Sequence, residues 1–196
     1  MIIDQDHFID LSFKESAKIK LETLEKCSEE IKNAIDVIKI CFQRGHKLLL
    51  CGNGGSAADC QHLATELTIR LNHDIKRRGL PAVALPTDSS AMTGGGNDIG
   101  FENTFARLVE ALGSEGDVLM AISTSGNSEN VLRAADKARE NKIVVIGLLG
   151  SGGGKIKSHC DLPIIVPSFN QQRIQEAHIT IGHTIAELVE YELSSE

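Results

Sequence analysis

The stretch Lys47-Leu-Leu-Leu-Cys-Gly-Asn-Gly-Gly-Ser56 decides the fold of this chain. A short apolar run leads into a glycine-rich turn, and a helical pattern then continues to about Leu71. The same unit returns where apolar runs at 81–85, 117–122 and 142–149 each lead into a turn and a helical pattern. Nearly continuous apolar strands that alternate with helices are typical of a parallel sheet covered on both faces.

The two ends of the chain complete this pattern. Residues 162–166 predict a fifth strand, and about 172–193 predict a long last helix. The first 45 residues contain no proline, and their apolar side chains recur at helical spacing, which predicts one or two amphipathic helices over about 7–44. We therefore predict an α/β fold, a doubly wound parallel five-stranded sheet flanked by helices in a flavodoxin-like sandwich, with an N-terminal helical extension.

Composition limits both the architecture and the partners. With 196 residues, of which 41% are hydrophobic and 24% charged, the chain fits one globular domain, 1–196, with N-terminal helices at 1–45 and an α/β core at 46–196. A net charge of −7 and the absence of tryptophan argue against nucleic-acid binding. No apolar run is long enough for a membrane span. Five cysteines without a C-x-x-C pair and an acidic start favour a cytoplasmic protein.

The glycine-rich turn at 52–57 literally fits the pattern G-x-G-x-x-A. A dinucleotide site would also need an acidic residue about 20 positions on, at the end of the next strand. Asp74 precedes that strand and Asp88 lies beyond it, so the dinucleotide interpretation is disfavoured.

A second turn, Ser123-Thr-Ser-Gly-Asn-Ser128, follows an apolar run and opens a helix. Hydroxyls and free backbone N–H groups at a helix N-terminus bind anions without a cation, which lets an acidic protein hold a phosphate. The alternative is helix capping, for which one such residue would suffice. We therefore favour phosphate binding.

Taken together, these stretches resemble the sugar isomerase (SIS) family, and in particular its phosphoheptose isomerase branch. The resemblance covers nearly the whole chain. It rests on Cys51-Gly-Asn-Gly-Gly-Ser-Ala-Ala-Asp59, Gln61-His-Leu-Ala-Thr-Glu66, Gly96-Asn-Asp98, Gly116-Asp-Val-Leu119, Ala121-Ile-Ser-Thr-Ser-Gly-Asn-Ser128, Arg173-Ile-Gln-Glu-Ala-His178 and His183.

The resemblance implies an aldose–ketose isomerase that converts sedoheptulose 7-phosphate to glycero-manno-heptose 7-phosphate through an enediol. That reaction opens the synthesis of heptose precursors for lipopolysaccharide or capsule. Glu66 would be the general base and His183 its acid–base partner, roles that suit a carboxylate and an imidazole. From the residues alone, the favoured interpretation is a solvated strip on one helix face, which includes His62 and in which Glu66 pairs with Arg70.

The resemblance also implies ligands for a metal and for the substrate. One Zn²⁺ per subunit would be held by His62, Glu66, Gln175 and His183, and two histidines with a carboxylate suit zinc. The substrate contacts that it implies are Asn53, Gly54, Gly55, Ser56, Glu66, Asn97, Asp98, Ser123, Thr124, Ser125, Ser128 and Gln175. For Asn97 and Asp98, which follow a glycine-rich stretch taken as a turn, turn chemistry is the alternative.

Two observations predict self-association. The last helix is apolar on more than one side, which indicates burial and, in so small a chain, contact with another subunit. Gln175 and His183 are about 12 Å apart along one helix and ~80° apart around it, so one ion barely reaches both. We therefore expect active sites that draw on more than one subunit, and the resemblance suggests a homotetramer.

The remaining histidines and cysteines predict structural roles. We expect His178 to be packed, and His7, His46, His73 and His159 to lie at the surface. Cys51 and Cys60 are expected as small buried hydrophobes.

Other functions remain open at this stage. A non-catalytic SIS scaffold for a replication initiator or another protein partner is one, although the presence of both Glu66 and His183 favours an enzyme. An isomerase of a different sugar phosphate is another. A phosphosugar sensor fused to a DNA-binding domain is disfavoured, because the first 45 residues are too few and too acidic.

Overall fold

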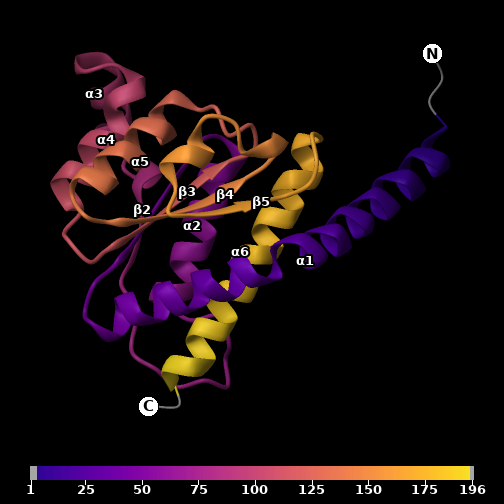
Figure 1. Cartoon of the computed structure of the whole chain (residues 1–196), viewed down its shortest axis with the longest axis horizontal. Coiled ribbons are helices and arrows are strands. Elements are labelled where there is room, and N and C mark those ends of the chain that lie inside the picture. Colours follow the sequence, from indigo (N-terminus) through magenta and orange to yellow (C-terminus); the bar gives the residue numbers. More distant parts are fainter. Residues whose placement is uncertain (1–3, 195–196) are drawn as a thin grey trace.

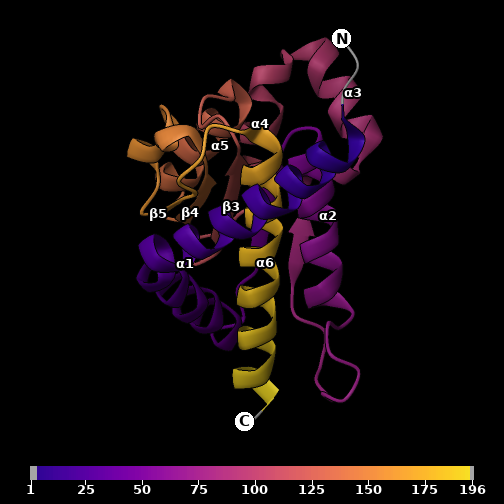
Figure 2. The same ribbon diagram turned by 90° about the vertical axis from the view of Figure 1, so that its right-hand side faces the viewer.

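The computed structural model describes residues 4–194 as a parallel sheet between two layers of helices (Figures 1 and 2). The helices are α1 (Gln5–Gln43), α2 (Gly55–Thr68), α3 (Ser89–Asp98), α4 (Phe101–Leu112), α5 (Glu129–Glu140) and α6 (Gln171–Ser194). The strands are β1 (Leu48–Gly52), β2 (Ala82–Ala84), β3 (Val118–Ser123), β4 (Val144–Leu149) and β5 (Leu162–Ile165). Short 3-10 turns lie at Leu85–Thr87, Ser151–Gly153 and Ile156–His159.

The five strands are parallel in the order β2-β1-β3-β4-β5. This confirms the predicted doubly wound, flavodoxin-like sheet. From β1 the chain continues to β2 on one side of the sheet, and from β3 it continues to β4 on the opposite side. Strand order therefore reverses between the neighbouring strands β1 and β3. In register, Gly52 at the end of β1 pairs with Ile122 on β3. The turns that follow these two strands therefore lie beside each other at the carboxyl edge, where doubly wound folds bind ligands.

Alternating side chains on the strands build two separate cores. On β1, Leu48 and Leu50 join the core under α1, α2 and α6, whereas Leu49 and Cys51 join the core under α4 and α5. Both faces of the sheet are thus covered, which explains why the strands are apolar without interruption.

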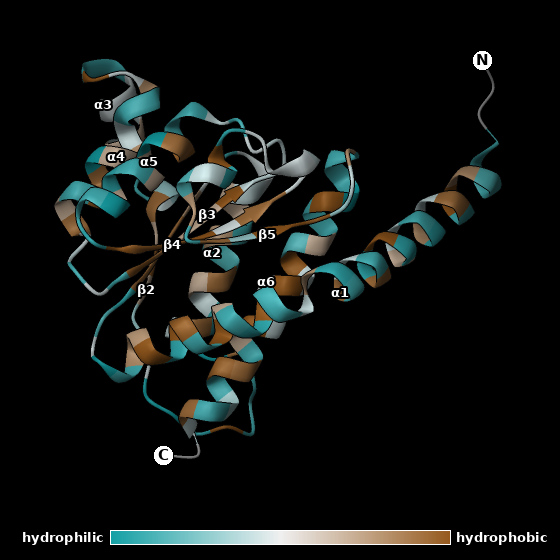
Figure 3. Ribbon diagram, in the orientation of Figure 1, coloured by the Kyte–Doolittle hydropathy of each residue, from teal (hydrophilic) through white to brown (hydrophobic). Residues whose placement is uncertain are grey.

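The N-terminal extension is one helix of 39 residues. Asp4 caps its start, because its carboxylate accepts a hydrogen bond from the backbone N–H of His7. The buried residues of α1 begin at Ile19, from where the helix packs on the body, and its N-terminal turns project (Figure 1). Apolar residues nevertheless continue along the projecting turns (Figure 3), where Phe13 is 76% exposed.

The prediction that the last helix needs a second subunit to bury it requires a correction. α6 packs against both α1 and α2 of the same chain, so Ile181, Ala186 and Val189 are buried without a partner. Within residues 4–194, no helix is long and apolar enough to cross a bilayer.

The interpretation of the glycine-rich stretch before Asn97 as a turn was wrong. Residues 89–98 form α3 instead, and Asp88 caps it by accepting a hydrogen bond from the N–H of Ala91 at 3.0 Å. This cap stabilises a helix that its glycines destabilise, since glycine costs about 1 kcal/mol per helical position relative to alanine. None of the residues of α3 is buried.

Candidate active site

Three side chains from α2 and α6 meet beneath the carboxyl edge of the sheet. The Nε2 atoms of His62 and His183 are 2.7 Å apart, and His62 Nε2 is 3.4 Å from Glu66 Oε1. One ligand atom from each residue lies within 4.8 Å of the others. The helices come this close because Gly182 has no side chain, and a Cβ there would be 2.6 Å from Leu63 Cδ1. The solvated-strip alternative is therefore incomplete, since it leaves out His183.

This cluster has the donors of a metal site. Two ring nitrogens 2.7 Å apart share a hydrogen bond, in which one ring donates its N–H and the other accepts it with its lone pair. The His62 side chain is 48% exposed and that of Glu66 18%, so the cluster is open to solvent on one side. Two imidazoles and a carboxylate fit Zn²⁺ by donor type.

Gln175 lies earlier on α6 and faces the start of α2 rather than the histidines. A Cβ on Gly55 would be 1.8 Å from Gln175 Nε2, so Gln175 in this position packs directly against the backbone of Gly55. Gln175 hydrogen-bonds to Asp59, whose pKa is raised by burial, while this bond and the nearby His62 and His183 act in the opposite direction. One chain therefore brings together three of the four predicted metal ligands, His62, Glu66 and His183. Gln175 is not among them, so only Gln175 still argues for a site shared between subunits.

The glycine-rich turn begins α2 without a capping side chain. Gly54 occupies the N-cap position with φ +56°, a conformation that favours glycine; its backbone carbonyl accepts hydrogen bonds from the N–H groups of Ala57 and Ala58, but it has no side chain to cap the helix. Ser56 is buried inside the first turn. The Asn53 side chain turns away from α2 and makes two hydrogen bonds, of 2.8 and 2.9 Å, with the side chain of Asn130 at the start of α5.

The serine-rich turn begins α5 in the same way. Ser128 is the N-cap residue, but its hydroxyl lies 3.2 Å from the hydroxyl of Ser123 and makes no capping bond. The Ser123 hydroxyl also accepts a hydrogen bond from the N–H of Gly126. Thr124 and Ser125 are half-buried. Capping therefore does not explain the hydroxyls, and an anion can use the first N–H groups of α5.

Asn97 and Asp98 lie at the end of α3, exposed to solvent. The Asn97 side chain donates a hydrogen bond of 2.7 Å to the Asp98 carboxylate. In the described part of the chain, no hydrogen bond joins either residue to the histidine cluster or to the serine-rich turn.

The other histidines and cysteines largely follow expectation. His178 is 1% exposed, and burial lowers its pKa to about 4, against a smaller opposite effect of the Leu149 backbone. Cys51 and Cys60 are fully buried, and His7 and His73 are exposed, as predicted.

His46 and His159 also lie at the surface, with side chains 33% and 31% exposed, and each has a carboxylate neighbour. The Nδ1 of His159 lies 2.5 Å from the carboxylate of Asp136, and His46 Nδ1 lies 3.8 Å from that of Asp117. A carboxylate beside each ring accounts for its partial burial.

Sequence reasoning missed two groups that hold the site together. One is Asn130, described above as the partner of Asn53. The other is Arg77, which donates to the backbone carbonyl of Glu66 at 2.8 Å and pairs with the buried Glu190 at 2.8 Å. An arginine in a polar loop gives no signal of burial in the sequence, because its partner on α6 lies 113 positions away.

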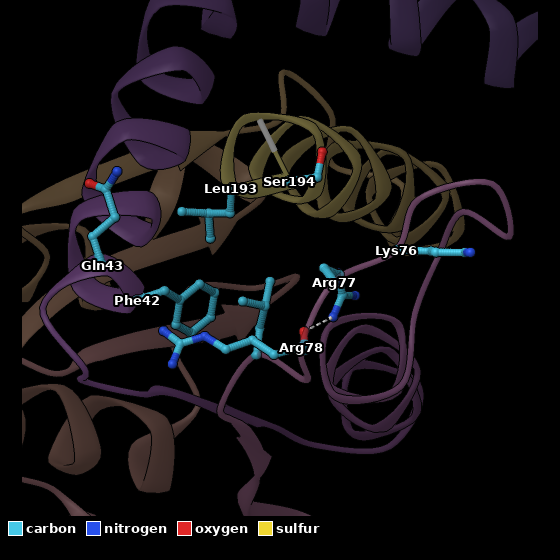
Figure 4. Close-up of a pocket in the computed structure, with 8 residues that line it drawn as sticks. Phe42, Gln43, Lys76, Arg77, Arg78, Leu193 and Ser194 are labelled. Carbon is cyan, nitrogen blue, oxygen red and sulfur yellow. Dashed lines mark hydrogen bonds between the residues drawn. The ribbon is translucent and has the colours of Figure 1, made fainter. Parts of the chain in front are cut away.

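A cavity of about 490 Å³ lies elsewhere, between the ends of α1 and α6 and the loop after α2 (Figure 4). Its lining is basic, with Lys76, Arg77 and Arg78. The guanidinium of Arg77 is committed to Glu190 and to backbone carbonyls. No residue of the histidine cluster lines this cavity.

Comparison with known proteins agrees with the geometry. The sequence profile of the SIS domain matches residues 12–150, which leaves out α6 and His183. Full-length relatives cover that helix. The phosphoheptose isomerase of Clostridium acetobutylicum is 47% identical over 192 residues, 97% of each chain, and that of Pelodictyon phaeoclathratiforme is 52% identical over 176 residues, 89% of this chain and 83% of its own.

Solved structures extend the likeness to three dimensions. The phosphoheptose isomerase of Neisseria gonorrhoeae superposes with a TM-score of 0.88 at 41% identity, over 95% of this chain and 98% of its own. That of Francisella tularensis gives 0.92 at 35% identity, over 96% and 100%. The chain therefore belongs to the SIS-domain family, in its phosphoheptose isomerase branch, and is a sugar-phosphate isomerase.

Proposed function

We propose that this enzyme converts sedoheptulose 7-phosphate to D-glycero-D-manno-heptose 7-phosphate, the aldose that feeds heptose precursors for lipopolysaccharide or capsule. The observation that carries the proposal is the meeting of His62, Glu66 and His183, whose ligand atoms all lie within 4.8 Å of one another. Relatives that share 47–52% of the sequence and bear the name phosphoheptose isomerase support the seven-carbon substrate.

Each residue has a part in the isomerisation. Glu66 removes the proton from C1 of the ketose and returns it to C2, because a carboxylate held near the reacting carbon suffices as a general base. His183 moves protons between the two oxygens of the enediol, for which an imidazole near neutrality suits. The open side of the cluster, where His62 is 48% exposed, is where the substrate enters.

His62, Glu66 and His183, with Gln175 as a fourth and weaker ligand, would hold one Zn²⁺. When bound, the ion polarises the carbonyl oxygen of the sugar and stabilises negative charge on it. Glu66 would then serve two roles, as a ligand of the ion and as the general base.

The phosphate binds at the start of α5 in this proposal. Ser123, Thr124, Ser125 and Ser128 supply hydroxyls, and the helix N-terminus supplies N–H groups and a partial positive charge. Gly54, Gly55 and Ser56 bring the start of α2 close to the sugar, and Asn97 and Asp98 on the exposed α3 contact its hydroxyls.

Self-association belongs to the same proposal, as a homotetramer with sites shared between subunits. Between residues 4 and 24, six large apolar side chains are at least 50% exposed, namely Phe8, Ile9, Leu11, Phe13, Leu21 and Leu24. A groove of about 250 Å³ between α1 and α6 continues this surface. So much exposed apolar surface on a projecting helix is typical of an interface.

A turnover assay tests the proposal. The enzyme is incubated with sedoheptulose 7-phosphate, with fructose 6-phosphate and with ribulose 5-phosphate, each before and after treatment with a chelator, and aldose phosphate is measured. We expect turnover of the seven-carbon ketose, with loss on chelation and recovery on addition of Zn²⁺. Turnover of a shorter ketose phosphate alone would contradict the assigned substrate.

A further inference from the structure

The side chains of Asn53 and Asn130 form a closed pair of amides. Asn53 Nδ2 donates to Asn130 Oδ1 at 2.8 Å, and Asn130 Nδ2 donates to Asn53 Oδ1 at 2.9 Å. Asn130 is 3% exposed, and Asn53 is half-buried. A buried asparagine that uses both its donor and its acceptor on one partner fixes the distance and the angle between two backbones.

This pair lies where the two halves of the proposed site are joined. Asn53 is in the turn between β1 and α2, the helix that carries His62 and Glu66. Asn130 is in the first turn of α5, next to the serine-rich turn. Because α2 and α5 cover opposite faces of the sheet, the pair spans the point at which strand order reverses.

The serine-rich turn is also fixed from its other side. A Cβ on Gly126 would be 2.1 Å from the carbonyl oxygen of Gly153, and the N–H of Ile156 donates to the carbonyl oxygen of Gly126 at 2.9 Å. The loop after β4 therefore holds the serine-rich turn in place. The Asn53–Asn130 pair connects the start of α5, next to this turn, to the turn that precedes α2.

We propose that Asn130 is a positioning residue that, through Asn53, sets the separation between the phosphate-binding turn and the acid–base cluster, and thereby selects the length of the sugar phosphate. This inference rests on the proposed function. The phosphate and the C1–C2 end of the substrate are bound by different loops, so a fixed separation suits one chain length. If the tie is lost, each half still binds its own group, but the reacting carbon is no longer aligned with Glu66.

The test compares Asn130→Ala, Asn53→Ala and the double variant with wild type. The control is Asn141→Ala, at the opposite end of α5. Three quantities are measured: kcat and KM for sedoheptulose 7-phosphate, the same for fructose 6-phosphate, and the inhibition constant of inorganic phosphate. Where Asn130→Ala does not fold, Asn130→Leu, which has a similar shape, takes its place.

For Asn130→Ala we expect kcat on the seven-carbon substrate to fall by about 10- to 100-fold, since misalignment of about 1 Å has that effect. The preference for seven over six carbons should fall with it, while the inhibition constant of phosphate stays within about twofold because the serine-rich turn is intact. Adding Asn130→Ala to Asn53→Ala should change little, because the pair acts as a unit.

Two results would overturn the inference. One is an Asn130→Ala enzyme with unchanged kcat and unchanged preference for chain length. The other is a parallel loss of phosphate binding and activity, which would mean that Asn130 merely supports the fold of the turn. If the wild-type enzyme does not act on sedoheptulose 7-phosphate, the proposed function fails by itself, and the same variants test the tie on whichever ketose phosphate is turned over.

Discussion

The ring nitrogens Nε2 of His62 and His183 lie 2.7 Å apart, although 121 positions separate the two residues in the chain. α2 carries the first histidine and α6 the second, and the contact depends on the close packing of these helices at Gly182. The proposed active site therefore depends on a helix–helix contact of the kind that sequence spacing does not reveal.

Replacement of His62 by Gln should weaken zinc binding by at least about 100-fold. Loss of a residue that only hydrogen-bonds to a metal ligand weakens binding by about 10- to 100-fold, and loss of the ligand itself should weaken it more. Zinc content after dialysis, measured by mass spectrometry, and affinity from competition with a chromogenic chelator check this. His159→Gln, in a histidine–carboxylate pair outside the site, should retain wild-type zinc content. Full zinc retention in His62→Gln would contradict the ligand set.

Replacement of Glu190 by Gln should lower the free energy of unfolding by about 3–5 kcal/mol, because it leaves Arg77 charged and buried without its partner. Glu190 is 0% exposed and also accepts hydrogen bonds from the N–H groups of Leu71 and Asn72. Urea unfolding measures the change. The control is Glu187→Gln, an exposed position on the same helix, and equal effects of the two would refute a special role for the pair.

Stability should fall in acid partly because of His178. Its pKa is lowered to about 4 in the folded protein, below the ordinary value of a histidine, so the unfolded state takes up the proton first. The stabilisation is complete above about pH 6.5 and is lost as pH falls toward 4, by up to about 3 kcal/mol.

Urea unfolding between pH 7 and pH 4 tests this prediction. The free energy of unfolding of His178→Leu should depend less steeply on pH than that of wild type. His7→Gln, at an exposed position, should keep the wild-type dependence. Parallel curves for wild type and His178→Leu would show that another group is responsible.

The exposed apolar face of α1 should be an interface. Leu21 and Leu24 lie one turn apart and are 63% and 61% exposed. The double variant Leu21→Glu and Leu24→Glu should dissociate the assembly, as measured by light scattering, and should reduce kcat. Lys26→Glu adds negative charge to the same helix at another exposed position and should leave the mass of the assembly unchanged. A monomer with full activity would contradict sites shared between subunits.

The sheet could be predicted from the sequence because each strand is an unbroken apolar run followed by a turn. The position of the ligand-binding edge follows from that pattern alone. α3 was misinterpreted because its glycines resemble a turn, and the capping Asp88 outweighs them. α6 was assigned to a subunit contact, since the sequence does not reveal that α1 crosses it within the same chain.

The site was predictable only in part. The hydroxyls of the serine-rich turn and the pairing of His62 with Glu66 are local patterns, and both were visible in the sequence. The ties between Asn53 and Asn130 and between Arg77 and Glu190 join residues 77 and 113 positions apart, and no local pattern marks either partner. Such contacts depend on tertiary packing, so only the fold reveals them.

The most direct measurement of the central claim follows sedoheptulose 7-phosphate in D₂O by NMR, with wild type and Glu66→Gln side by side. Wild type should form the aldose phosphate with deuterium at C2, because the proton removed from C1 exchanges with solvent on the base. Glu66→Gln should be slower by at least about 100-fold, as expected on loss of a general base. Aldose formation by Glu66→Gln at the wild-type rate would contradict the account.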